Sequence, residues 1–188
     1  MDLLGGPERA ARAGQLGNVR AALGWSFGPH GEGARATSLA AGAGVFLVAM
    51  SLLAEAHRWT SQALAALAEE ARGSEHEMRL CSAFGLATMF ARGNNTAARS
   101  AFERGLQIAE ELGDDLSQLR LLGRLQLFHA RIGDFRGAMV YAQRCLSVAR
   151  ALADPEALAA APAFVGTSHH MIDEQVEARA EFEADIGG

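Results

Sequence analysis

Residues 131–150 read RIGDFRGAMVYAQRCLSVAR: a glycine, an aspartate and an aromatic residue, followed by apolar residues at helical spacing. Gly133 can adopt the left-handed backbone conformation that ends a helix, and Asp134 can accept hydrogen bonds from the free amides of the next helix. Phe135 can then pack between the two helices. A phosphate cradle would need more glycines and exposed amides. The stretch therefore predicts a turn between two packed helices and no ligand site.

Helices are predicted throughout the chain. Leucine and alanine dominate its 188 residues, apolar residues recur three and four positions apart, and runs of β-branched residues are absent. Glycine-rich or polar segments interrupt this pattern, and we expect helices of roughly 12 to 20 residues between them. The expected breaks are residues 28–33, 55–59, 72–77, 92–96, 112–115, 131–135, 152–156 and 171–175.

Part of the sequence repeats itself. ARGNNTAARSAFERGLQIA, ARIGDFRGAMVYAQRCLSVA and MIDEQVEARAEFEADI align so that Ala98, Ala138 and Ala178 coincide, 40 residues apart each time (138 − 98 and 178 − 138). An earlier copy aligns through Ala63, 35 residues before Ala98 (98 − 63). Each unit would be a helix, a short turn and a second helix, and the small alanine would let the two helices approach closely.

The breaks and the repeat together predict one all-α domain of helical hairpins over residues 1–188. A leading helix and turn, with the helix containing Asn18 to Trp25, would occupy residues 1–30. The hairpins would follow at residues 34–72, 75–113, 115–152 and 155–188.

The turn at residues 133–138 has the pattern G-D-aromatic-x-x-A, followed four and seven residues later by Ala142 and Cys145. This pattern resembles the tetratricopeptide repeat, although a 40-residue spacing is longer than is usual for that family. The resemblance implies a tetratricopeptide-like right-handed α-solenoid of about four helical hairpins. In such arrays the first helices of the hairpins line a concave surface that holds peptides or small effectors.

Longer segments resemble the helical region of large bacterial transcriptional regulators. These segments are GNVRAALGWSF (17–27), VFLVAMSLLAEAHRWTSQALAAL (45–67), ARSAFERGLQIAEELGDD (98–115) and GDFRGAMVYAQRCLSVARALADP (133–155). In those regulators an ATPase module and a LuxR-type or winged-helix DNA-binding domain are joined to tetratricopeptide-like repeats. The resemblance implies a non-catalytic sensor or protein-interaction segment that binds a small-molecule effector, a peptide or a protein partner on its concave face. The alternative is a freestanding tetratricopeptide-like scaffold protein.

Two activities of such regulators are not expected in this chain. A Walker phosphate loop, G-x-x-x-x-G-K-[ST], needs a lysine, and all 17 basic residues here are arginine. The sequence contains no basic recognition helix with a helix-turn-helix pattern. Its net charge of −5 also gives no electrostatic reason to bind nucleic acid. We therefore expect neither ATP hydrolysis nor direct DNA binding.

A cytoplasmic protein with no membrane partner is expected. Cys81 and Cys145 lie far apart in apolar helical runs, where buried thiols act as small apolar groups and do not form a disulfide. The most apolar stretch, residues 40–54, holds 15 uncharged residues, whereas about 20 are needed to span a bilayer. The N-terminus lacks the basic region and long apolar core of a signal peptide.

No catalytic, metal or cofactor site is expected. In SHHMIDE, His169 and Asp173 lie four residues apart, as do His170 and Glu174, so each pair can share a helix face. A zinc site needs further ligands, and none is near. Neither a G-x-S-x-G nucleophile motif nor an H-E-x-x-H zinc motif occurs. We therefore expect that the chain is not an enzyme.

Arg120, Arg124 and Arg131 are the candidate effector- or partner-binding residues. They are four and seven residues apart on the expected first helix of a hairpin, so they share one face. An arginine can hold a carboxylate or a phosphate through two hydrogen bonds. The alternative, common for surface arginines, is a solvated face or ion pairs with nearby acidic residues. Those acidic residues are Glu110, Glu111, Asp114 and Asp115.

The chain is also expected to be cut from a longer array. Each unit of a solenoid is covered only by its neighbours. The final helix, near Gln175 to Ile186, ends while its apolar positions still follow a helical pattern. Because uncovered apolar surface tends to find a partner, we expect a second copy of the chain to cover it in a homodimer.

Overall fold

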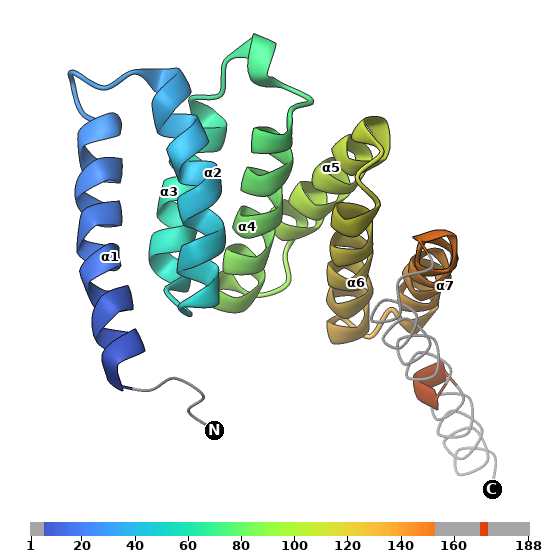
Figure 1. Cartoon of the computed structure of the whole chain (residues 1–188). Helices are drawn as coiled ribbons and strands as arrows, with labels where there is room; N and C mark the ends of the chain where they lie inside the picture. The colour runs from blue at the N-terminus through green and yellow to red at the C-terminus, as the bar shows by residue number, and fades with distance from the viewer. Residues whose placement is uncertain (1–5, 153–169, 173–188) are drawn as a thin grey trace, which may run out of the picture.

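The computed structural model describes residues 6–152 and 170–172, and every regular element in these residues is a helix (Figure 1). The all-α prediction is confirmed. The elements are α1 (Gly6–Ser26), α2 (Gly33–Ala49), α3 (Leu53–Ala65), a short 3₁₀ helix η1 (Glu69–Ala71), α4 (Glu75–Arg92), α5 (Thr96–Leu112), α6 (Asp115–Arg131) and α7 (Phe135–Leu152).

The helices follow one another in a row, and each packs chiefly on its neighbours in the chain (Figure 1). Two contacts skip a helix: α2 packs on α4, and α6 touches α4. These contacts bring together α2, α4 and α6, each of which begins one of the expected hairpins. The expected last hairpin, including Ala178 and the Gln175 to Ile186 helix, lies outside the described residues except for residues 170–172.

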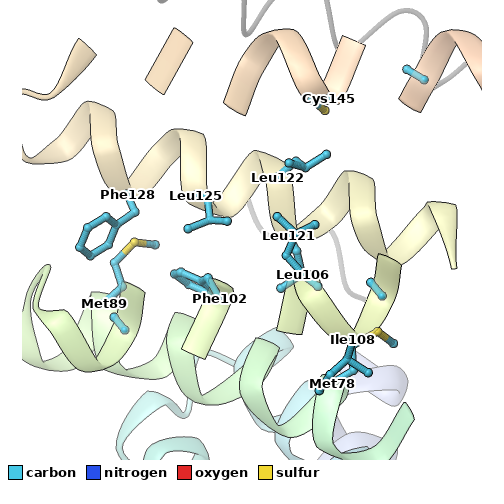
Figure 2. Packing of buried hydrophobic residues seen from close by; sticks show 13 residues of the cluster. Met78, Met89, Phe102, Leu106, Ile108, Leu121, Leu122, Leu125, Phe128 and Cys145 are labelled. Carbon is cyan, nitrogen blue, oxygen red and sulfur yellow. The ribbon is translucent and has the colours of Figure 1, made fainter. Parts of the chain in front are cut away.

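Two clusters of buried apolar side chains meet at α4. Leu80 and Ala87 belong to a cluster that α4 shares with α1, α2 and α3. Met78 and Met89 belong to a second cluster, which α4 shares with α5, α6 and α7. Figure 2 shows this second cluster, with Met89 directed toward Phe128 of α6. Because α4 contributes to both clusters, it links the two halves of the described row.

Glycine allows close approach between helices on both sides of α4. A Cβ atom added at Gly85 would lie 2.5 Å from the Phe102 ring of α5. One added at Gly44 of α2 would lie 2.7 Å from Thr60 of α3 and 3.1 Å from Ala83 of α4. Phe102 is fully buried, so its ring cannot move aside without disturbing the second cluster. A side chain at either glycine would therefore push the helices apart.

The same turn chemistry joins α5 to α6 and α6 to α7. Gly113 and Gly133 have φ values of 65° and 76°, in the left-handed region that favours glycine. Asp114 and Asp134 follow them, and each carboxylate accepts a hydrogen bond from the amide three residues later, at 3.0 and 2.9 Å. Phe135 is partly buried at the start of α7. The predicted helix-to-helix turn at residues 131–135 is confirmed.

The break expected at residues 55–59 is wrong, because α3 runs through these residues. The chain turns earlier, at residues 50–52, where Ser51 has a φ of 59° and α3 begins without a side-chain cap. This turn lacks the glycine and aspartate that mark the others. The polar residues that suggested a break instead contact other helices: Glu55 accepts a hydrogen bond from Nε of Arg20 in α1 at 2.7 Å.

Because this break was predicted in the wrong place, the predicted alignment of the earliest copy of the repeat was also wrong. Ala98 and Ala138 both lie in the first turn of their helices and are fully buried. In α3 the position near the helix start is Ala56, which is also fully buried, whereas Ala63 lies near the end of that helix. The equivalent alanines are thus 42 and 40 residues apart (98 − 56 and 138 − 98).

Two further sequence predictions concern the cysteines and the possibility of a membrane-spanning helix. Cys81 and Cys145 are free thiols and both are buried, as predicted. Burial, with the nearby charge of Glu77, raises the pKa of the Cys81 thiol to about 12, so it is protonated at neutral pH. Within the described ranges, no helix combines the length and the apolar character that crossing a bilayer requires.

Gly85→Ala should lower the free energy of unfolding by about 1 to 3 kcal/mol, because the added methyl group overlaps the buried Phe102 ring. Gly42→Ala is the matched control: it also changes a glycine inside a helix, but a Cβ atom there meets nothing within 4 Å. Its stability should stay the same or rise slightly. Urea unfolding followed by circular dichroism measures both, and equal stability of the two variants would contradict the close packing.

Asp134→Ala should cost about 1 kcal/mol of stability, because it removes the cap of α7. Hydrogen bonds from the Gly137 amide and from His129 lower the pKa of Asp134. Its contribution is therefore present above the ordinary aspartate pKa of about 3.9 and is lost as the pH falls through the lower pKa of the folded state. Thermal unfolding of both proteins should show a constant difference near neutral pH that shrinks in acid. A difference that grows on acidification would argue against the cap.

Candidate functional site

A cavity of about 440 Å³ lies between α2, α4 and α6. This volume falls in the range of about 300 to 1,000 Å³ that is usual for small-molecule sites. The lining residues are Gly42 and Val45 of α2; Glu75, Met78, Arg79 and Ser82 of α4; and Asp114, Leu116, Ser117, Arg120, Leu121 and Arg124 at and after the start of α6. Three helices that are far apart in sequence therefore build one site.

Two of the three candidate arginines line this cavity. Arg120 is exposed and Arg124 is partly buried, and they lie one helical turn apart on α6. Arg131 lies about 10 Å farther along the helix axis, by the 1.5 Å rise of each residue. Its guanidinium carbon is 5.2 Å from the centre of the Phe90 ring of α4, a cation–π contact outside the cavity. The three arginines on this face of α6 therefore lie at two separate places: Arg120 and Arg124 at the cavity, and Arg131 outside it.

The acidic residues that could have paired with these arginines form their hydrogen bonds and ion pairs with other groups, although Asp114 also attracts Arg120 electrostatically. Glu110 forms an ion pair with Arg144 of α7. Glu111 and Asp115 each accept a hydrogen bond from a glutamine of their own helix, and Asp114 caps α6. No ion pair joins any of these four residues to the three candidate arginines in the part of the chain that the structure describes.

Arg124 holds its charge in an unfavourable environment. Its Nη1 atom is buried and has no hydrogen-bond partner among the described residues. Burial and the positive charge of Arg120 lower the pKa of Arg124 to about 10. The guanidinium is still charged at neutral pH, and Arg124 forms no ion pair with a carboxylate among the described residues. Groups perturbed in this way by burial and by a neighbouring charge are frequent at binding sites.

The cavity has a net positive lining in a protein whose net charge is −5. Three arginines and two carboxylates line it. Glu75 and Arg79 form an ion pair, with Oε1 and Nη2 2.5 Å apart. Asp114 uses its carboxylate to cap α6. The charge of Arg120 also helps to lower the pKa of Asp114, so these two residues attract each other, and Arg124 is left to interact with an anion that enters from solvent.

Another buried charge, that of Glu77, is fully paired with hydrogen-bond donors. Glu77 of α4 is only 4% exposed, and it accepts hydrogen bonds from Nε and Nη2 of Arg104 in α5 at 3.0 and 2.9 Å. The amide of Gly73 donates a third hydrogen bond at 2.6 Å. This two-pronged pair joins α4 to α5 and lies outside the cavity lining. Its role is structural.

The histidines do not form a metal site in the described part of the chain. No group of three histidine, cysteine, aspartate or glutamate side chains there could hold a metal ion. Of the sequence SHHMIDE, only His170, Met171 and Ile172 are described; His169, Asp173 and Glu174 lie outside those residues. The expectation about these two pairs therefore stays a prediction.

Gly42, Val45 and Arg79 were not identified from the sequence as site residues. Gly42 and Val45 share an exposed face of α2 three residues apart, which resembles any helix surface facing solvent. The hairpin repeat was the one available signal, because it predicts that first helices lie side by side.

No protein-family model matches this chain, and no curated protein is significantly similar to it. The resemblance to bacterial regulators therefore rests on the sequence motifs and on nothing else.

Arg124→Met should raise the free energy of unfolding by about 1 kcal/mol, because it removes an unsatisfied, partly buried donor while keeping most of the side-chain volume. Arg124→Lys is the control: it keeps the charge and should give little or no gain. Chemical denaturation of the three proteins measures the differences. A clear loss of stability in Arg124→Met would show that the folded state depends on the guanidinium, and that its buried nitrogen is not a destabilising feature.

Proposed function

We propose that this chain is a non-catalytic sensor or partner-binding segment of a bacterial ATP-dependent transcriptional regulator, and that it acts in the cytoplasm. We also propose that its helices form a tetratricopeptide-like right-handed solenoid. Sequential packing of the helices, buried alanines at repeating positions and two turns of identical chemistry support this architecture.

The cavity between α2, α4 and α6 carries the functional part of the proposal. In a solenoid of hairpins the first helices face the concave side, where peptides and small effectors bind. These three helices here enclose a cavity of about 440 Å³ with two arginines that form no ion pair with a carboxylate among the described residues. Arg124 is partly buried, and an unpaired buried charge lowers stability, so a purely structural role does not account for it.

The alternative, a freestanding scaffold, differs in what precedes the repeats. A regulator requires a nucleotide-binding module in the same reading frame, whereas a scaffold does not. Sequencing the coding region upstream of Met1 should reveal an in-frame module with a Walker motif. An in-frame stop codon directly upstream, with no such module, would favour the scaffold and overturn the regulator assignment.

The isolated chain should neither hydrolyse ATP nor bind DNA tightly, because it lacks the lysine of a phosphate loop and has a net negative charge. Phosphate release measures the first activity, and fluorescence anisotropy with labelled duplex DNA at several salt concentrations measures the second. Nanomolar DNA binding that weakens steeply with salt would contradict the proposal that the DNA-binding function lies in another domain.

A further inference from the structure

We infer that the cavity between α2, α4 and α6 binds a small monocarboxylate with an apolar body, and that Arg124 and Arg120 hold its carboxylate. This inference rests on the proposed function, because it names the chemical class of the effector for the same surface. The arginines, the charge inventory of the lining, its apolar residues and the volume of the cavity each support one part of it.

The arginines select an anion. The Nη1 atom of Arg124 is a buried donor without an acceptor among the described residues, and Arg120 lies one turn away on the same wall. A carboxylate can accept two hydrogen bonds from one guanidinium in a fixed geometry. A rotation of the flexible Arg124 side chain would bring its unsatisfied nitrogen to the ligand. Binding would then supply the acceptor that the protein itself does not provide.

The acidic residues that line the cavity favour a ligand with a single negative charge. Glu75 already neutralises Arg79, and Asp114 places a second carboxylate at the same cavity. With three arginines and two carboxylates the lining has a net charge of about +1, which suits one negative charge. A phosphate monoester, which carries close to two negative charges at neutral pH, would face repulsion from Asp114.

The apolar members of the lining select the remainder of the ligand. Val45 and Leu116 are 53% and 50% exposed, although both are large apolar side chains beside the cavity. Met78 and Leu121 are almost completely buried and form its apolar wall. An aliphatic or aromatic body would cover this surface and gain the free energy of apolar burial.

The size of the cavity favours a small molecule over a peptide. Its volume of about 440 Å³ lies near the lower end of the range for small-molecule sites. Arg131, which could engage a longer ligand, contacts the Phe90 ring and lies about 10 Å beyond Arg124 by helix geometry. The two unpaired arginines are grouped at the cavity instead.

Isothermal titration calorimetry of the full 188-residue chain can test this inference with benzoate, 4-phenylbutyrate and octanoate at millimolar concentration. At least one should bind, and its neutral amide should bind at least about tenfold more weakly, because it lacks the charge that the arginines pair with. Phenyl phosphate and an acetylated peptide ending in leucine are the competing ligand classes. Each should bind more weakly than the best carboxylate.

Three variants place the binding in the cavity. Arg124→Gln should reduce the affinity at least about tenfold by removing the charged donor. Gly42→Leu should do the same by filling the cavity; a Cβ atom there meets no protein atom within 4 Å, so the fold should be retained. Arg131→Gln, on the same helix but outside the cavity, should leave the affinity within about twofold. Circular dichroism verifies that each variant is folded.

Several results would overturn the inference: none of the three carboxylates binds, phenyl phosphate or the peptide binds more tightly, or folded Arg124→Gln and Gly42→Leu proteins keep the wild-type affinity. None of these results affects the test of the proposed function, which depends on the region upstream of Met1. Conversely, carboxylate binding that depends on Arg124 in a chain with no upstream module would leave this inference intact and remove the regulator assignment.

Discussion

Close contact around α4 is the constraint on which the rest of the structure depends. Gly85 lets the Phe102 ring of α5 lie against one side of the helix, and Gly44 brings α2 close to the other side. Both apolar clusters meet on α4 for this reason, and α2 and α6 come to flank it. That arrangement places Met78 and Arg79 in the wall of the cavity. The site is thus a by-product of how tightly its central helix is packed.

The parts of the fold that sequence reasoning predicted correctly are those with local chemistry. The turn at Gly133 and Asp134 was predicted because its two residues determine it locally: the glycine adopts the left-handed conformation and the aspartate caps the next helix. The turn at Ser51 was missed because serine, unlike glycine, gives no sequence signal for the left-handed conformation that this residue adopts. The alignment of Ala63 with Ala98 was wrong for the same reason, because a repeat can be aligned only when the starts of its helices are placed correctly.

The candidate site shows the same division. Helical spacing correctly placed Arg120, Arg124 and Arg131 on one helix, but it could not indicate which part of that face other helices would cover. Gly42 and Val45 come from a helix far away in sequence, so no local pattern connects them with the arginines. Burial also decides the cost of each charge: Glu77 is matched by Arg104, whereas Arg124 is matched by nothing described. Such asymmetry depends on which side chains the packing of the helices buries, so it is visible only in three dimensions.

The identical joints after α5 and α6 have a consequence for how such a chain can evolve. Each turn is formed by two adjacent residues, Gly113 with Asp114 and Gly133 with Asp134, and its left-handed glycine and its capping hydrogen bond are both local. A gene segment that encodes one hairpin can therefore be duplicated or deleted together with the residues that form its turn. Array length can then vary between descendants, while the cavity keeps its lining as long as the three helices that build it are retained.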